Sequence, residues 1–239
     1  MKKFFKILTA TTLLFVFSVV LVGCKSNVLW KADINDNNLF GVYGTVEKND
    51  NSLILKRPDG ANYAGSTYFG ESDKNFEWEN SGLTVSLNVN IDTSKYGQND
   101  YSVWSLALNE NDGKYITENS VFFVGTDSNV KFIYKNIGVE TDYSVLTEEE
   151  TAVSLTTGDY TIKFDYNVND NKEIILDVLL LDSENTKIYS SLNNKVVVIE
   201  HDGYTPNSPL KEENVGGLRY LWLARTTVNG VVKGLKITK

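Results

Sequence analysis

A strict alternation of apolar and polar side chains in residues 82–92 constrains this chain more than any other feature. The apolar positions are Leu83, Val85, Leu87, Val89 and Ile91. Polar side chains occupy the positions between them. Successive side chains of a strand point to opposite faces, so this period of two predicts a half-buried antiparallel strand.

The same alternation continues along the chain. Residues 160–168 repeat it, and residues 174–181 form a nearly continuous apolar run around Asp177 that is typical of a central strand. Shorter apolar runs predict strands at residues 121–124, 130–134, 196–199, 218–224 and 231–237. Turn dipeptides such as Asn229-Gly230 separate them, and helical periodicity is scarce. We therefore expect an all-β domain, a two-sheet antiparallel β-sandwich.

The first 23 residues differ in kind from the rest. A basic start with Lys2, Lys3 and Lys6 precedes a mostly apolar stretch at residues 7–21, which ends in small residues. This order is typical of a secretory signal peptide. The apolar stretch is too short, and wrongly flanked, for a membrane-spanning helix.

Leu-Val-Gly-Cys at residues 21–24 resembles the lipobox of bacterial lipoproteins. The resemblance implies that Cys24 is acylated and becomes the first residue of an exported protein anchored to a membrane by lipid. Lys25 stands where an Asp retains lipoproteins of enteric bacteria in the inner membrane, which favours the outer membrane or cell surface in an envelope of that type. We expect a signal peptide at 1–23, the lipidated cysteine and a short tether at 24–29, and one sandwich domain at 30–239.

Charge and composition exclude several function classes. Without the signal segment the chain carries 20 basic and 31 acidic side chains, a net charge of −11, and so lacks the positive surface that nucleic acids require. One Cys and one His exclude a disulfide framework, a Cys/His zinc site and a Cys–His catalytic pair within the chain.

The order of the expected strands resembles the concanavalin A-like (laminin-G-like) jelly roll. Early strands at residues 30–33 and 52–55 precede the 82–92 strand, and residues 101–108 and 121–125 resemble the family's paired strands. Residues 231–238 are similar to the family's last strand, which returns beside the first. An immunoglobulin-like or carbohydrate-binding-module sandwich is the alternative.

Aromatic side chains in polar loops are the main candidates for ligand binding. Flat sugar rings stack on exposed tyrosine or tryptophan, while Asn and Asp reach the hydroxyls. The candidate residues are Tyr63, Tyr68, Trp78, Tyr96 and Tyr101. Packing beneath a loop is the alternative for all five. Trp104 shares its expected strand face with Leu106 and Leu108, which predicts a place in the core.

Catalytic groups are harder to assign. Glycoside hydrolysis needs two facing carboxylates, and Glu77 and Glu79 of an extended strand would both point away from Trp78. His201 lies in an expected turn, with no nucleophile motif to partner it. We assign no catalytic residue and favour a binding protein over an enzyme.

Calcium is the one cofactor the sequence suggests. Oxygen-rich side chains cluster at residues 33–38, 109–113 and 167–171, and hard cations prefer such ligands. Asn and Asp are also the ordinary turn formers, which is the competing explanation.

Three functions remain. The first is a surface-anchored, lectin-like lipoprotein that binds a glycan. The second is a protein-binding adhesin or an accessory subunit of a surface complex, and the third is a glycoside hydrolase. One sandwich fold can host all three, so the fold alone does not separate them.

Overall fold

The computed structural model describes residues 28–35, 39, 45–56, 63–68, 82–110, 116–127, 129–135, 152–191, 196–202, 205–224 and 226–239, with only the backbone given for some of the strand residues. The signal segment and Cys24 lie outside these residues. Within the described part of the chain, no helix is long and apolar enough to cross a membrane.

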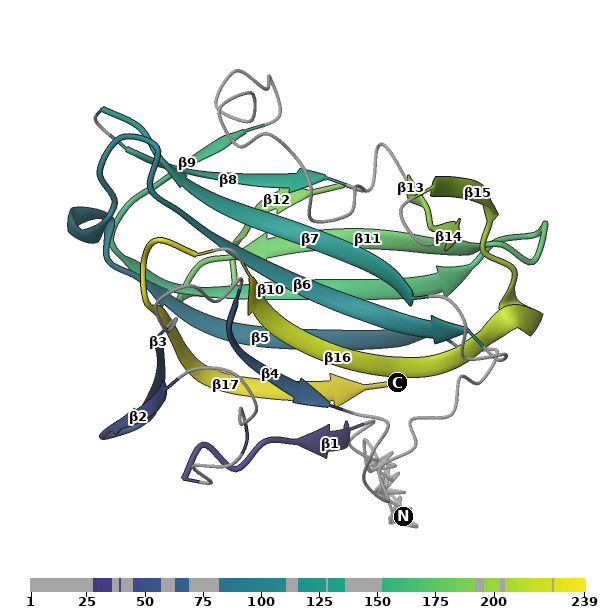
Figure 1. Ribbon diagram of the computed structural model, residues 1–239, viewed down its shortest axis with the longest axis horizontal. Helices are drawn as coiled ribbons and strands as arrows, with labels where there is room; N and C mark the ends of the chain where they lie inside the picture. The colour runs from purple at the N-terminus through teal and green to yellow at the C-terminus, as the bar shows by residue number, and fades with distance from the viewer. Residues whose placement is uncertain are drawn as a thin grey trace, which may run out of the picture.

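Two antiparallel sheets form the layers of a sandwich (Figure 1). The first sheet has the order β12-β11-β10-β5-β17-β3-β2, with β1 beside β17 and β13 beside β11. Its strands are β1 (Val28–Lys31), β2 (Thr45–Asn49), β3 (Ser52–Lys56), β5 (Leu83–Ile91), β10 (Gly158–Val168), β11 (Ile174–Leu181), β12 (Lys187–Ser190), β13 (Val196–Val197) and β17 (Gly230–Thr238).

The second sheet has the order β4-β16-β6-β7-β8-β9. Its strands are β4 (Tyr63–Tyr68), β6 (Tyr101–Glu110), β7 (Ile116–Gly125), β8 (Val130–Lys135), β9 (Val153–Leu155) and β16 (Val215–Ala224). A separate hairpin, β14 (Ile199–Asp202) with β15 (Thr205–Pro209), lies against β7. Short 3-10 turns η1 (Thr93–Lys95) and η4 (Glu212–Asn214) complete the described elements.

The predicted β-sandwich is therefore confirmed. All five apolar positions of the 82–92 alternation are buried, and they face the second sheet from β5. The closing strand returns beside the first as expected, because β17 pairs with β1 through Trp30 and Ile237.

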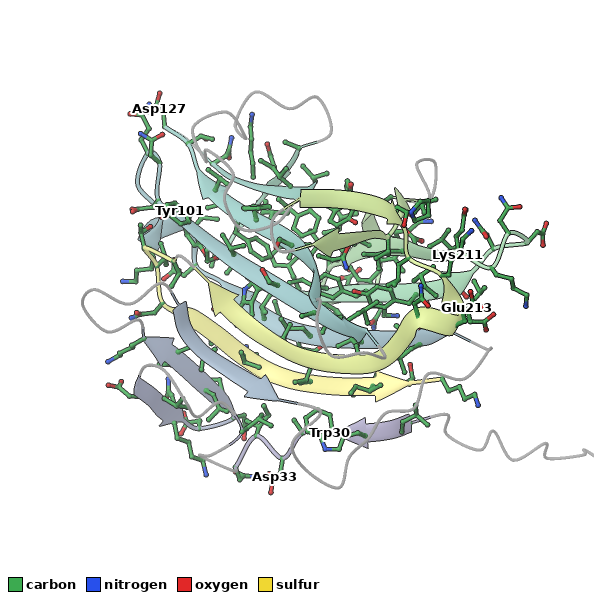
Figure 2. The ribbon with its side chains drawn as sticks, turned by 45° about the vertical axis from the view of Figure 1, so that its right-hand side comes forward. Trp30, Asp33, Tyr101, Asp127, Lys211 and Glu213 are labelled. Carbon is green, nitrogen blue, oxygen red and sulfur yellow. The ribbon has the colours of Figure 1, made fainter. Side chains whose placement is uncertain are left out.

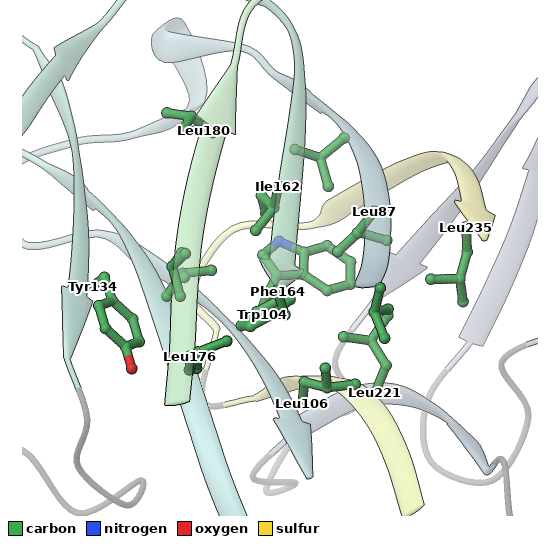
Figure 3. Close-up of a cluster of buried hydrophobic side chains, with 14 of the residues drawn as sticks. Leu87, Trp104, Leu106, Tyr134, Ile162, Phe164, Leu176, Leu180, Leu221 and Leu235 are labelled. Atoms are coloured by element: carbon green, nitrogen blue, oxygen red, sulfur yellow. The ribbon is translucent and has the colours of Figure 1, made fainter. Parts of the chain in front are cut away.

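The core lies between the two sheets. Trp104 on β6 is 1% exposed, which confirms its predicted place. Figure 3 shows it among Leu87, Ile162 and Phe164, which come from β5 and β10 of the first sheet. The tryptophan thereby joins the two layers.

One expected strand is divided. Residues 196–199 form the end-to-end strands β13 and β14, with a break at Val198. The Val198 amide donates to the Ile174 carbonyl, while its own carbonyl accepts from the Leu210 amide. The chain changes partner at this residue, from β11 of the first sheet to the segment that follows β15, so a continuous ladder is not formed.

Candidate ligand-binding loops

The structure describes the predicted ligand-binding residues to different extents. Trp78, like Cys24, lies outside the described residues. Tyr63 and Tyr68 are described through the backbone of β4, which pairs with β16. Tyr96 and Tyr101 are described in full, and both belong to the connection from β5 into β6.

The loops around Tyr101 gather at one end of the sandwich (Figure 2). The backbone of Tyr101 is bound to the β16–β17 turn: its amide donates to Thr227 Oγ1 at 2.8 Å, and the Thr227 amide donates to its carbonyl at 2.8 Å. The end of β7 is bound to the β5–β6 connection, since the Gly125 amide donates to the carbonyl of Asp100, the residue before Tyr101, at 2.7 Å. Three connections are thus joined by backbone hydrogen bonds at this end.

The loop that precedes Tyr101 has a tight internal turn. The Gly97 amide donates to Asp100 Oδ2 at 2.8 Å, and the Asp100 amide donates to the Gly97 carbonyl at 3.1 Å. Asn99 between them has a φ of +69°, in the left-handed region that Asn tolerates.

Gly125 allows this loop to approach β7 closely. A Cβ atom built on Gly125 would lie 2.1 Å from the Gly97 carbonyl oxygen, so no larger residue fits without moving the backbone. The position of the loop is therefore fixed by packing as well as by hydrogen bonds.

Tyr96 supports the loop from beneath. Its ring packs against the main core, and its hydroxyl lies 2.8 Å from Ser102 Oγ. Burial raises the pKa of Tyr96 to about 12. The side chain is partly buried, which leaves a smaller face for a ligand than the sequence suggests.

Tyr101 is also partly buried, but it packs against a different cluster on the outer face of the second sheet. Exposed polar side chains lie on the same three connections: Gln98, Asn99, Asp127, Asn129 and Thr227. An aromatic ring and exposed amide, carboxylate and hydroxyl groups on adjoining connections are the kinds of group that a sugar site uses.

The outer face of the second sheet is apolar and closed to solvent. Val103, Phe122, Val124 and Ile133 form a cluster there, with exposed fractions between 0% and 1%. Beside it, the hydroxyls of Ser105 and Ser120 lie 2.7 Å apart, and both residues are fully buried. At this cluster, therefore, the face is not an open sugar platform.

Backbone register adds Tyr63 to the same end of the second sheet. Tyr63 is opposite Ala224, and Ala224 is opposite Val103, two residues from Tyr101. Tyr68 is opposite Tyr220, several residues further along the sheet. Register thus places the backbone of Tyr63 two strand spacings from β6, about 10 Å across the sheet, and two residues along the strand from Tyr101.

The oxygen-rich segment at residues 167–171 forms a turn closed by an ammonium group. Asn169 Oδ1 accepts from the amides of Asn171 and Glu173, each at 2.9 Å. Lys211 Nζ lies 3.0 Å from Glu173 Oε1 and 3.2 Å from the Asn171 carbonyl. Hydrogen bonding from Asn169, and then from Lys211, lowers the pKa of Glu173. A calcium ion would meet a fixed positive charge here.

The other two oxygen-rich segments are described only in part. Asp33 Oδ1 accepts from the amide of Asn35 at 2.8 Å, which is an ordinary Asx turn. Within the described ranges, no group of three or more His, Cys, Asp and Glu side chains could hold a metal ion. Calcium at residues 33–38 or 109–113 stays a prediction.

The structure gives no side-chain positions for the carboxylates and the histidine considered for catalysis. Glu77 and Glu79 are outside the described residues, and His201 is described through its backbone only. At the loop end, Asp92 accepts from both the amide and the hydroxyl of Ser94, which lowers its pKa and assigns it a structural role in the turn.

Comparison with known proteins finds similarity among solved structures, at low sequence identity. No protein-family model matches the sequence, and no curated protein is significantly similar to it. Among solved structures, the carbohydrate recognition domain of Emp46p, in a mutant form, is 10% identical over 90% of this chain and 98% of that one, with a TM-score of 0.49.

Two further solved structures have comparable scores. A legume lectin-like domain from Entamoeba histolytica is 13% identical over 84% of this chain and 90% of its own, with a TM-score of 0.45. The PL-14 alginate lyase from Aplysia kurodai is 7% identical over 84% and 88%, with a TM-score of 0.46. The strand order of the two sheets is what defines the sandwich of this chain.

Proposed function

We propose that this protein is an exported lipoprotein, acylated at Cys24, that binds a glycan at the loop end of its sandwich. The observation that carries the glycan proposal is the fixed arrangement of three connections around Tyr101. The three connections are joined by hydrogen bonds, and they carry a partly exposed ring and exposed amide, carboxylate and hydroxyl groups.

Rigidity matters for a sugar site because every loop that orders on binding reduces the affinity. The hydrogen bonds of Thr227 to Tyr101 and of Gly125 to Asp100 join these connections within the protein itself. Tyr101 would stack on a sugar ring, and the neighbouring Asn99, Asp127 and Asn129 would contact its hydroxyls. Tyr63 would extend the site along the sheet edge, and Tyr68 and Trp78 are the remaining candidates of the same kind.

Lipid anchoring rests on the lipobox at residues 21–24. Two acyl chains give a stable anchor, since each buried methylene contributes about 0.8 kcal/mol. The tether to the first strand is short, so the β1 end of the sandwich would lie close to a membrane surface, with the loops around Tyr101 at the other end of β17.

A glycan array followed by calorimetry on the best hit tests the proposal. We expect Tyr101→Ala to weaken binding about tenfold or more, the equivalent of about 1.4 kcal/mol. Tyr101→Phe keeps the ring and removes only the hydroxyl, so it should retain most of the affinity. Equal unfolding midpoints of the two variants would show that the comparison concerns binding and not folding.

Other results would overturn the glycan proposal. A folded wild-type protein that binds no glycan, but recovers a partner protein from membranes, would establish the adhesin or accessory-subunit alternative. Glycan turnover abolished by replacing one carboxylate would establish a hydrolase.

A further inference from the structure

Three lysines form a row across the outer face of the first sheet. Lys31 on β1 is directly opposite Lys236 on β17, and Lys236 is opposite Ser86 on β5. Ser86 is in turn opposite Lys163 on β10. Directly opposed residues share a face of the sheet, so these residues lie along one line perpendicular to four neighbouring strands.

The lysine side chains point away from the core. Leu235 and Ile237, which flank Lys236, are 2% and 0% exposed, and the residues on either side of Lys163 are fully buried. Lys31 and Lys236 are exposed and Lys163 is partly exposed. Ser86 of β5, which lies between Lys236 and Lys163 in the row, is only 4% exposed.

This row is unusual in a chain whose remainder carries a net charge of −11. Like charges directly opposite one another destabilise a sheet. In the part of the chain that the structure describes, no carboxylate forms an ion pair with any of the three lysines.

The acidic side chains on this face lie mainly on β10 and β11: Asp159, Asp165 and Asp177, the last directly opposite Asp165. Lys233 Nζ lies 2.7 Å from both carboxylate oxygens of Asp159. Asp165, two residues from Lys163 on β10, accepts from Thr84 Oγ1 at 2.7 Å. The positive charge of Lys31 and Lys236 therefore lies on the β1 side of the face.

Exposed apolar side chains lie on the same strand. Val28 and Leu29 of β1 are 40% and 47% exposed, and they are the large apolar residues that the described structure leaves open to solvent. Val28 is opposite Thr238, two residues beyond Lys236 and on the same face. Figure 2 shows β1, marked by Trp30, at the edge of the molecule.

We propose that the row of Lys31, Lys236 and Lys163, with Val28 and Leu29, docks on an anionic phospholipid surface and sets the orientation of the sandwich on its membrane. The orientation rests on the lipid anchor of the proposed function. Cys24 precedes Val28 by four residues, at most about 14 Å of chain. The row is thus held near the surface, within reach of a potential that decays over about 8 Å at physiological salt.

The contribution of the row to membrane binding can be estimated from its charge. One lysine near an anionic leaflet increases partitioning about fivefold, so three increase it on the order of 100-fold. The row then places the β1 side of the outer face against the membrane, and the direction of the strands relative to the membrane determines how far the loop end around Tyr101 stands from it.

The test uses the full lipidated chain purified from membranes and bound to two kinds of vesicle, phosphatidylcholine alone and phosphatidylcholine with about 30% phosphatidylglycerol. Acetylation rates of individual lysines are read by mass spectrometry. We expect Lys31, Lys163 and Lys236 to react at least fivefold more slowly on the anionic vesicles, and the protection to disappear in high salt. Lys48, Lys95 and Lys131, which lie away from the outer face of the first sheet, should change less than twofold.

Two variants with the same net charge separate the effect of the row from that of total charge. The triple variant K31Q/K163Q/K236Q should lose the difference in orientation between the two vesicles, read as protection of β1 and β17 from hydrogen exchange. The control variant K48Q/K95Q/K131Q carries the same charge change and should retain it.

Two results would overturn the docking proposal. One is equal lysine reactivity on both vesicles. The other is protection of the row by a soluble polyuronate at the same salt but by neither vesicle, which would make the row a site for an acidic glycan. A wrong lipid-anchor proposal would give a different result, because the protein would then not be retained on phosphatidylcholine vesicles at all. Binding to the anionic vesicles through the row would still support docking.

Discussion

Phe122 and Phe123 are consecutive residues of β7, and both are 0% exposed although they lie on opposite faces of the second sheet. Phe123 packs in the main core, with its ring centroid 5.5 Å from that of Phe132. Phe122 packs with Val103, Val124 and Ile133 in the outer cluster. The second sheet is therefore buried on both faces at this strand.

Truncating either phenylalanine should carry a similar cost. We expect Phe122→Ala and Phe123→Ala each to lower the free energy of unfolding by about 3–5 kcal/mol, because each leaves a cavity in a closed environment. Urea unfolding at constant slope measures both. A loss of less than about 1 kcal/mol for Phe122→Ala alone would mean that the outer face is open in solution.

The buried amide of Asn119 gives a double-mutant prediction. Its Nδ2 donates to the Tyr166 hydroxyl at 3.2 Å, while its Oδ1 has no hydrogen-bond partner among the described residues. Tyr166→Phe leaves the amide unsatisfied and should cost about 1–3 kcal/mol. Adding Asn119→Leu removes the stranded polar group, so the double variant should recover much of that loss. Strictly additive losses in chemical denaturation would contradict this coupling.

The close approach of Gly125 to Gly97 predicts a position-specific effect of alanine. Gly125→Ala places a Cβ atom against a backbone oxygen, so we expect a displaced loop, a lower unfolding midpoint and weaker glycan binding. Gly158→Ala is the control, because its Cβ atom would meet only Tyr160 Cε2 at 3.9 Å. The control should be neutral or stabilise the fold by up to about 1 kcal/mol. Equal thermal shifts for the two variants would refute the steric explanation.

Tyr96 predicts a loss of stability at alkaline pH. Burial raises its pKa from 10.0 to about 12, so the folded state holds the proton more tightly than the unfolded state. The resulting stabilisation is complete below pH 10 and is lost as the pH rises from 10 towards 12. Tyr96→Phe should make this fall shallower, by at most about 1.4 kcal/mol per pH unit.

The alkaline prediction is checked by urea unfolding at several pH values, with tyrosinate absorbance followed in parallel. Burial also raises the pKa of Tyr134 and Tyr166, so part of the fall should persist in the variant. An unchanged slope in Tyr96→Phe would show that its hydroxyl titrates as in the unfolded chain.

Local alternation was sufficient for the strands that have one face in the core. The period of two at residues 82–92 predicted β5 and its buried face correctly, and the apolar run at 174–181 predicted β11 with its bounds. The break at Val198 could not be predicted in this way, because it depends on where Ile174 and Leu210 stand in space.

At the candidate site, too, the sequence predicted some features and missed those that depend on tertiary contacts. The sequence singled out Tyr96 and Tyr101 as neighbours of a polar loop, but spacing could not show that Tyr96 packs on the core while Tyr101 borders the outer cluster. Gly125 and Thr227 were missed, since their contacts come from residues far away along the chain. The lysine row was missed for the same reason: it exists only through the register of β1, β17, β5 and β10.

The sequence by itself determined the β-sandwich class and the face of each main strand that is buried, because a strand's side-chain period is a local property of the backbone. It also predicts the export signal and lipid anchor through a contiguous motif. Only the tertiary structure decided which faces are closed, which loops meet at Tyr101 and which lysines share a line. These depend on pairings between residues as far apart as Lys31 and Lys236, which no local pattern specifies.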